Sequence, residues 1–150
     1  MLAFYQSSRV TLADMDEQQA RAYVGRNHGG VLATIKRDGR PQLSNVAYFL
    51  DDDGTIKISV TKDRAKTKNL LRDPRASLVA LDPKDWYSYV VVEGDASFID
   101  DDRTLPELRR YYRRVRDEDH PNWQEYDQAM IADKRVLLVI TPTHFYGMAR

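Results

Sequence analysis

The sequence predicts a mostly β, α+β fold in which six strands form an antiparallel barrel with peripheral helices. Early hairpin turns, one helix between the third and fourth strands, and helices that otherwise come late in the chain favour this arrangement over alternating βαβ units. With 150 residues the chain has the commonest size of one domain. We therefore expect residues 1–150 to form a single domain.

The first part of the chain predicts a helix followed by a β-meander. A helix is expected over Asp14–Gly25, because its acidic opening complements the positive end of a helix dipole. The apolar run Gly30–Ile35 predicts a strand, and Asp38-Gly39 after it is a strong hairpin-turn signal. Further strands are expected over Gln42–Leu50 and, from the alternation of apolar and polar residues, over Thr55–Thr61.

The middle of the chain predicts one helix and two strands. The helix over Arg64–Asp73 ends before Pro74, since proline disfavours helical geometry in the residue that precedes it. Strands follow over Ala76–Leu81 and Tyr89–Ile99. The alternation of the second of these strands breaks at Glu93-Gly94, which predicts a bulge or bend of the kind that suits a closed barrel.

The last third predicts two helices and a final strand. Thr104 is the expected N-cap of the first helix, the second covers Trp123–Ala132, and the strand covers Arg135–Ile140. Arginine pairs at Arg109-Arg110 and Arg113-Arg114 are compatible with RNA binding, but acidic runs flank them. A salt-bridged surface helix is the favoured interpretation, and no nucleic-acid partner is expected.

Composition excludes several kinds of chemistry. The 23 basic and 23 acidic side chains cancel, so no global field draws the protein to nucleic acid or an anionic membrane. There is no cysteine, which leaves redox chemistry to a borrowed cofactor. His28, His120 and His144 lack any paired spacing, so no metal site is expected. Without a signal-peptide pattern or a membrane span, the protein is expected to be cytoplasmic.

The segment Arg64-Ala65-Lys66-Thr67-Lys68, which Thr61 and Lys62 precede, is the sharpest local feature. Free amides at a helix N-terminus, together with cations and hydroxyl groups, suit a phosphate. Cations in a first helical turn oppose the helix dipole unless an anion is bound there. From spacing alone, a solvated basic helix face explains the segment equally well.

Two further groups could contact a flat ring. Polar residues at Arg40–Asn45 begin the second strand, where side chains of a barrel can hydrogen-bond the edge of a heterocycle. The pattern alone favours a hairpin whose polar groups face water. Trp86-Tyr87, expected in the loop before the fifth strand, could stack on a ring, and interface or core packing explains the pair equally well.

Several motifs occur in a fixed order along the chain: Gly30–Ile35, Asp38–Val46, Arg64–Leu70, Asp73–Leu78, Val91–Gly94, Arg135–Leu138 and Tyr146-Gly147. Together they closely resemble the pyridoxamine 5′-phosphate oxidase-like superfamily. The closest likeness is to the actinobacterial branch that uses the deazaflavin coenzyme F420, and it extends over nearly the whole chain. The resemblance implies a six-stranded split β-barrel, usually a homodimer with two cofactor sites between its subunits.

The resemblance also implies roles for particular residues. Lys66, with Arg64 and Thr67, would hold the cofactor phosphate. Other positions of the family's site would line the strand beside the phosphate, border the tricyclic ring, or reach in from the partner subunit. The residues beside the phosphate would be Ser59, Val60 and Thr61, with Ala65 of the helix. Those that border the ring would be Pro41, Gln42, Ser44 and Asn45. Those that reach in from the partner subunit would be Trp86 and Tyr87.

The function implied is an F420-dependent oxidoreductase that passes a hydride from the reduced deazaflavin to an unsaturated or electron-poor small molecule, such as an enone or quinone. An FMN-dependent oxidase or reductase is the alternative enzyme, and a non-catalytic cofactor carrier is a different class. Vitamin oxidation is disfavoured, because the chain ends Tyr146–Arg150 in place of the Arg-Leu-Ala-Pro end of those oxidases. No catalytic side chain is assigned.

Overall fold

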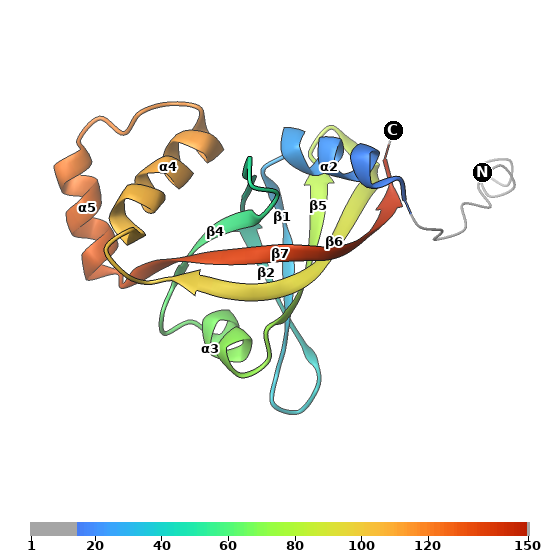
Figure 1. Ribbon diagram of the computed structural model, residues 1–150, viewed down its shortest axis with the longest axis horizontal. Coiled ribbons are helices and arrows are strands. Elements are labelled where there is room, and N and C mark those ends of the chain that lie inside the picture. The colour runs from blue at the N-terminus through green and yellow to red at the C-terminus, as the bar shows by residue number, and fades with distance from the viewer. Residues whose placement is uncertain (1–14, 150) are drawn as a thin grey trace, which may run out of the picture.

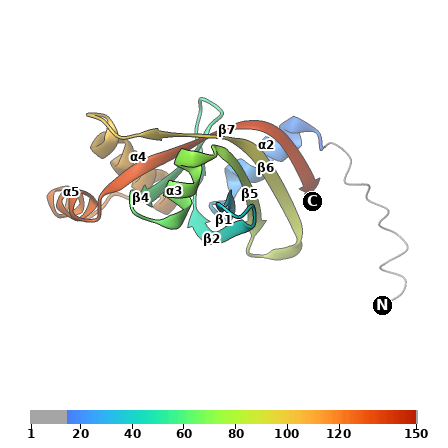
Figure 2. The same cartoon turned by 90° about the horizontal axis from the view of Figure 1, so that it is seen from below.

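The computed structural model describes residues 15–149 and shows one curled antiparallel sheet with four helices around it (Figure 1). Seven strands are hydrogen-bonded in the order β2-β1-β5-β6-β7-β4-β3. Their bounds are β1 Gly29–Ile35, β2 Pro41–Ala47, β3 Phe49–Leu50, β4 Ile56–Thr61, β5 Arg75–Asp82, β6 Asp85–Ile99 and β7 Arg135–Met148. The curled sheet confirms the mostly β split barrel, and Figure 2 shows the curl from below.

The seventh strand is a fragment of the expected second strand, Gln42–Leu50. The chain breaks at Tyr48, so that β2 pairs with β1 while β3 pairs with β4. Tyr48 is fully buried, its amide donates to the His28 carbonyl at 2.9 Å, and its hydroxyl donates to the Val24 carbonyl at 2.8 Å. The prediction of one continuous strand was wrong because the chain changes partners after Tyr48, which its hydroxyl anchors to α2. The residues before it pair with β1, whereas Phe49 and Leu50 pair with β4.

The two longest strands, β6 and β7, run side by side across the molecule (Figure 1). Their register shifts between Glu93 and Gly94, which confirms the predicted bulge. A Cβ at position 94 would lie 2.4 Å from the Thr141 carbonyl oxygen, so only glycine fits this close approach. Because β6 begins at Asp85, Trp86 and Tyr87 lie in a strand, and their expected placement in a loop was wrong.

The helices are α2 Glu17–Arg26, α3 Ala65–Arg72, α4 Thr104–Arg116 and α5 Trp123–Ala132. Asp14, the expected start of the first helix, lies outside the described residues, and Asp16 is the N-cap. Thr104 is not the N-cap of α4: Arg103 takes that place, and the Thr104 hydroxyl instead accepts from the Asp101 amide. Across residues 15–149, none of the helices combines the length and apolar character needed to span a bilayer.

Two apolar clusters hold these elements together. The larger fills the inside of the curled sheet and includes Leu32, Ile58, Leu78 and Leu138, all with 1% exposure or less. A smaller one, centred on Leu108, Tyr126 and Leu137, seats the α4–α5 pair against the sheet. This arrangement places the two late helices at one end of the sheet, beyond β4 and the start of β7 (Figure 1).

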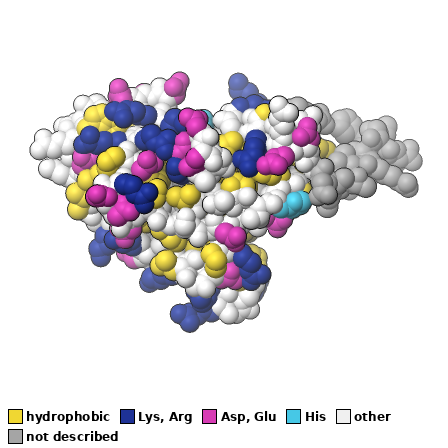
Figure 3. Space-filling model, in the orientation of Figure 1, with side chains coloured by type: hydrophobic (Ala, Val, Ile, Leu, Met, Phe, Trp, Pro, Cys, Tyr) yellow, Lys and Arg dark blue, Asp and Glu magenta, His cyan; other side chains and the backbone are white. Residues whose placement is uncertain are grey.

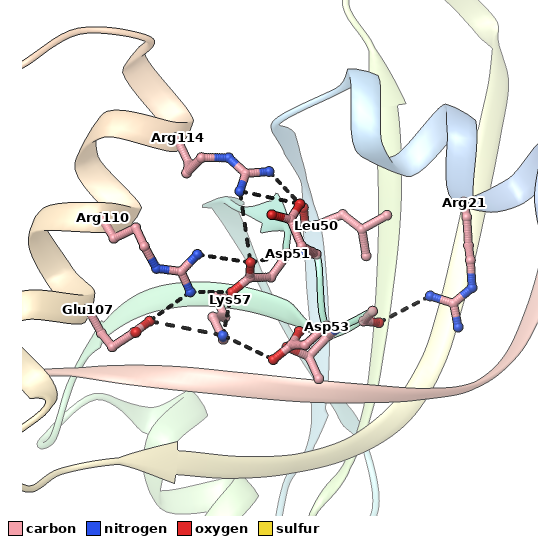
Figure 4. Close-up of polar contacts among 11 residues, drawn as sticks. Arg21, Leu50, Asp51, Asp53, Lys57, Glu107, Arg110 and Arg114 are labelled. Atoms are coloured by element: carbon pink, nitrogen blue, oxygen red, sulfur yellow. Dashed lines mark hydrogen bonds and ion pairs between the residues drawn. The ribbon is translucent and has the colours of Figure 1, made fainter.

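Helix α4 is a salt-bridged helix, as predicted. Arg109 pairs with Asp127 of α5, while Arg110 pairs with Asp51. Asp51 also pairs with Lys57, and both side chains are almost fully buried. Figure 4 shows Arg110 and Arg114 reaching from α4 to Asp51, and basic and acidic side chains intermingle over α4 in Figure 3. The Asp51 carboxylate therefore ties α4 to the turn between β3 and β4.

We expect Asp51→Asn to lower the free energy of unfolding by about 3–5 kcal/mol at neutral pH, because it removes the buried carboxylate that pairs with both Lys57 and Arg110. Lys57 then keeps only the more exposed carboxylates of Asp53, at 3.3 Å, and Glu107, at 4.0 Å. Hydrogen bonds from Arg110 and Lys57 hold the pKa of Asp51 well below its ordinary value. Its stabilisation is thus complete above about pH 3.9, the unfolded-state pKa, and is lost as pH falls toward the lower folded-state pKa. Urea denaturation between pH 2 and pH 7 measures both effects.

Asp119→Asn is the matched control for this prediction. Asp119 pairs with Arg113 on the surface and its side chain is 72% exposed. Its removal should change stability by less than about 1 kcal/mol. An Asp51→Asn variant that is as stable as this control would contradict the proposed role of the buried pair.

Candidate functional site

A hollow of about 360 Å³ lies at the start of α3, where β2, β4 and β7 converge. The first residues of α3 and the last residues of β4 face it from two sides. Its lining is Gln42, Ser44, Val60, Thr61, Arg64, Ala65, Lys66 and Arg135. Three parts of the sequence thus build one concave surface: β2, the consecutive elements β4 and α3, and the distant β7.

The first turn of α3 presents unpaired positive groups to this hollow. Arg64 is the N-cap but makes no side-chain capping bond, and the turn contains no acidic residue. The first amides of any helix lack partners within the helix, and its N-terminus carries partial positive charge. Thr67 stands behind the turn, where its hydroxyl donates to the Thr61 carbonyl at 2.7 Å. This bond fixes the helix start against the end of β4.

Three buried polar atoms of the described residues have no hydrogen-bond partner: Ser44 Oγ, Thr61 Oγ1 and Arg135 Nε. All three belong to residues that line the hollow. An unsatisfied buried polar group costs about 1–3 kcal/mol, and native proteins contain few of them. Their concentration at one place indicates that a polar ligand completes these hydrogen bonds.

The charges in the hollow favour an anion. Burial lowers the pKa of Lys66, and the positive charges of Arg64 and Arg135 lower it further. Within the described part of the chain, neither Arg64 nor Lys66 has an acidic partner, whereas Lys62 pairs with Asp100 at 2.9 Å. Arg135 Nε lies 4.0 Å from Asp133. A bound phosphate would relieve this repulsion, because it would supply the missing negative charge.

Seven of the residues expected at the site line this hollow: Gln42, Ser44, Val60, Thr61, Arg64, Ala65 and Lys66. Gln42 is held in place, since its Oε1 accepts from Thr34 at 2.8 Å. The spacing of the β2 residues places alternate side chains on opposite faces, and only Gln42 and Ser44 line the hollow. The structure thus brings together most of the residues expected to hold or flank the cofactor phosphate, and half of those expected to border its ring.

The remaining expected residues lie elsewhere in this chain. Pro41 and Asn45 are exposed on β2, and Ser59 lines a neighbouring hollow. Trp86 and Tyr87, which are 84% and 63% exposed, lie at the start of β6, away from α3. Thr67 supports the helix from behind, as described above. No group of three or more metal-ligating side chains occurs in residues 15–149.

Arg135 is the lining residue that sequence reasoning missed. It opens β7 and stands opposite Thr61 in the β4–β7 ladder, which brings its guanidinium to the hollow. Its Nη1 donates to the Ser59 carbonyl at 3.4 Å. A basic residue at the start of a strand carries no local signal of a site, and only knowledge of the strand pairing could have identified it.

Residues 16–149 match the protein family described as pyridoxamine 5′-phosphate oxidase. The chain belongs to this family. Among solved structures, it is similar to a conserved hypothetical protein, Rv2991, from Mycobacterium tuberculosis, with 26% identity and a TM-score of 0.71 over 91% of this chain and 87% of the other. It is also similar to an F420 reductase, with 26% identity and a TM-score of 0.65 over 83% and 94% of the two chains.

A FAD-binding protein from Mesorhizobium loti shares the fold of this family member, with 17% identity and a TM-score of 0.62 over 89% of this chain and 94% of the other. The family match places the chain in an oxidase family, and the cofactors named for these two relatives, F420 and FAD, are of the deazaflavin and flavin type. The orphaned polar atoms and unpaired cations fit the phosphate that such cofactors carry.

We expect Thr61→Val to leave the free energy of unfolding unchanged or to raise it by up to about 1 kcal/mol, because the orphaned hydroxyl is replaced by an apolar group of the same shape. The matched control is Thr34→Val. The Thr34 hydroxyl is buried, donates to Gln42 and accepts from Asn69 at 3.1 Å, so its loss should cost about 1–3 kcal/mol. Urea denaturation of the two variants decides, and equal losses would contradict the assignment of Thr61 to a ligand.

Proposed function

We propose that the protein is an F420-dependent oxidoreductase that reduces an unsaturated or electron-poor small molecule, such as an enone or quinone. The observation that carries the proposal is the hollow at α3, where three orphaned polar atoms meet unpaired cations. The 26% identity to an F420 reductase, over 94% of that chain, supports the choice of cofactor.

The residues of the hollow would hold the cofactor through two kinds of contact, charged and neutral. Lys66, Arg64 and the free amides at the start of α3 bind the phosphate as charge-assisted donors. The hydroxyls of Ser44 and Thr61 complete polar contacts beside it. When bound, the reduced deazaflavin supplies the hydride, and the protein contributes orientation and exclusion of water. No side chain of the hollow is assigned as a proton donor.

Positive charge around the hollow supports F420 over FMN. Arg64, Lys66 and Arg135 line the hollow and supply more charge than one phosphate needs. Lys68 is exposed on α3 outside this lining. The excess suits the polyglutamate tail of F420. Lys62 contributes less than the sequence indicates, because it already pairs with Asp100.

We further propose that the chain acts as a homodimer whose subunits share the two cofactor sites. The exposed rings of Trp86 and Tyr87 support this proposal, because a partner subunit could bury them beside its own cofactor. Pro41 and Asn45, exposed on the edge strand β2, would then border the ring from this chain.

Two other functions compete with this proposal. An FMN-dependent oxidase or reductase is favoured by the family match and by the FAD-binding relative. A cofactor carrier without turnover is favoured by the lack of an assigned proton donor in the hollow. Fluorescence titrations with F420 and with FMN, at low and moderate salt, distinguish an F420-dependent enzyme from an FMN-dependent one. Reduced-cofactor oxidation with a panel of acceptors separates an enzyme from a carrier.

Saturable micromolar F420 binding with weak FMN binding is the expected result of the titrations. Affinity should fall with added salt, because the contacts are between charges. Tight FMN binding with no F420 binding would overturn the choice of cofactor. F420 binding without oxidation by any acceptor would favour the carrier.

We expect Lys66→Ala to weaken F420 binding by roughly 1–3 kcal/mol, because a charge-assisted contact to the phosphate is lost. Lys84→Ala, an exposed lysine that does not line the hollow, is the matched control and should bind as the parent does. Fluorescence titration measures both variants. Unchanged affinity in Lys66→Ala would remove this residue from the site.

F420 affinity should fall as pH rises through the lowered pKa of Lys66. Burial and the neighbouring arginines favour the neutral amine in the free protein, whereas the anion binds the protonated form and raises its pKa. Lys66 therefore takes up a proton on binding when the pH lies between its pKa in the free protein and its higher pKa in the complex. Lys66→Arg, which stays charged, should flatten this dependence in titrations between pH 7 and pH 10. An equal slope in both proteins would assign the dependence to another group.

A further inference from the structure

A second hollow, of about 460 Å³, lies beside the first, between the sheet and the α4–α5 pair. Both helices and the adjoining strands β4 and β7 contribute to its walls. Its volume lies in the range of small-molecule pockets, which is about 300–1,000 Å³. Partly exposed apolar side chains face it: Tyr111, Tyr112, Val115 and Met130. We call it the aromatic hollow.

The aromatic hollow adjoins the hollow at the start of α3, which we call the cofactor hollow. Arg135 lines both of them. Ser59 of the aromatic hollow directly precedes Val60 and Thr61 of the cofactor hollow on β4. Molecules bound in the two hollows would therefore lie next to each other, and transfer of a hydride between two molecules requires such proximity.

Two of the three tyrosines that line the aromatic hollow, Tyr111 and Tyr126, present rings rather than free hydroxyl groups. Tyr111 donates its hydroxyl to the Ala47 carbonyl at 2.7 Å, and Tyr126 donates to the Leu108 carbonyl at 2.7 Å. Burial raises the pKa of Tyr126 to about 12, so this hydroxyl keeps its proton. With these two hydroxyls bonded, Tyr111 and Tyr126 offer ring faces and edges to a ligand. Arg116, Glu125 and Arg135 add charged groups to the lining.

The aromatic rings are fixed by contacts with one another. Tyr112 makes edge contacts with Trp123 and Tyr126, with ring centroids 5.7 and 5.4 Å apart. Arg113 covers Trp123 from outside, with its guanidinium carbon 4.7 Å from the ring centroid. A rigid set of rings favours a flat conjugated ligand over a flexible aliphatic one.

His120 adds a hydrogen-bond donor to this aromatic wall. Its Nδ1 accepts from the Asn122 amide at 3.0 Å, so in the neutral ring the proton is on Nε2. His120 packs against Tyr112, with centroids 5.1 Å apart, and lines the hollow. The wall thus combines ring surfaces with an N–H group, which matches a flat molecule that carries a carbonyl oxygen.

We propose that the aromatic hollow binds the electron acceptor, a planar conjugated carbonyl compound of the quinone or enone class, with the His120 Nε2–H donating to its carbonyl oxygen. The identification of the ligand as an acceptor rests on the proposed function. The hollow itself belongs to the free protein, so its binding of such a compound does not depend on F420.

Menadione, a flat naphthoquinone, is the probe for this proposal, and Trp123 is the reporter. The chain has two tryptophans, so Trp86→Phe leaves Trp123 as the only one. Because Trp123 packs on Tyr112 and His120, menadione in the hollow should quench its fluorescence saturably.

Ala129→Phe, introduced into the Trp86→Phe protein, fills the hollow from an exposed position of α5. Gln128→Phe, exposed on the same helix but outside the lining, is the matched control.

We expect Ala129→Phe to weaken menadione binding at least tenfold, while F420 affinity changes less than twofold. Ala129→Leu should give an intermediate loss, and Gln128→Phe should bind as the parent does. Lys66→Ala should show the reverse pattern, with weakened F420 binding and unchanged menadione binding. Circular dichroism and urea denaturation confirm that each variant is folded.

Three results would overturn the proposal. The first is an absence of saturable quenching in the Trp86→Phe protein. The second is equal loss of menadione binding in Ala129→Phe and Gln128→Phe. The third is a loss of F420 affinity in Ala129→Phe as large as that in Lys66→Ala, which would assign the hollow to part of the cofactor. If F420 does not bind to the unaltered protein, the proposed function fails, and the menadione series still decides whether the hollow binds a quinone.

Discussion

The antiparallel pairing of β4 with β7 runs from Ile56–Ile140 to Thr61–Arg135 and joins segments that are far apart in the chain. At one end of this ladder, Thr61 is followed within four residues by α3, so the pairing sets Arg135 beside the first turn of that helix. The α4–α5 pair is inserted before β7, and Leu137 of that strand seats both helices. A one-residue slip would turn every side chain of β7 to the opposite face and separate the residues of both hollows.

The two hollows use opposite kinds of surface. The cofactor hollow concentrates cations and orphaned polar atoms, which cost stability in the free protein. The aromatic hollow is lined by rings, and the hydroxyls of Tyr111 and Tyr126 are already bonded. The buried Asp51 pair, together with the apolar interior of the sheet, holds the frame around them. The proposed cofactor site therefore lies where buried polar atoms lack partners, on a scaffold whose other buried charges are paired.

Local patterns predicted most of the elements, and the failures have identifiable causes. The Asp38-Gly39 turn, the helix before Pro74 and the Glu93-Gly94 bulge follow from short-range geometry, and each is present. Tyr48 breaks a run that looks continuous in sequence, because its partners lie on α2 and before β1. Thr104 has the chemistry of an N-cap but bonds backward to Asp101, so Arg103 occupies the cap.

The sequence by itself determined the strand periodicity, the cation-rich first turn of α3 and, through ordered motifs, the family. These properties depend on neighbouring residues, whose geometry the chain fixes locally. Only the tertiary structure decided that Arg135 lines the site, that Ser44 and Thr61 lack partners, and that a ring-lined hollow adjoins them. Each of these depends on the register between distant strands, which is set by the burial of whole faces rather than by any local pattern.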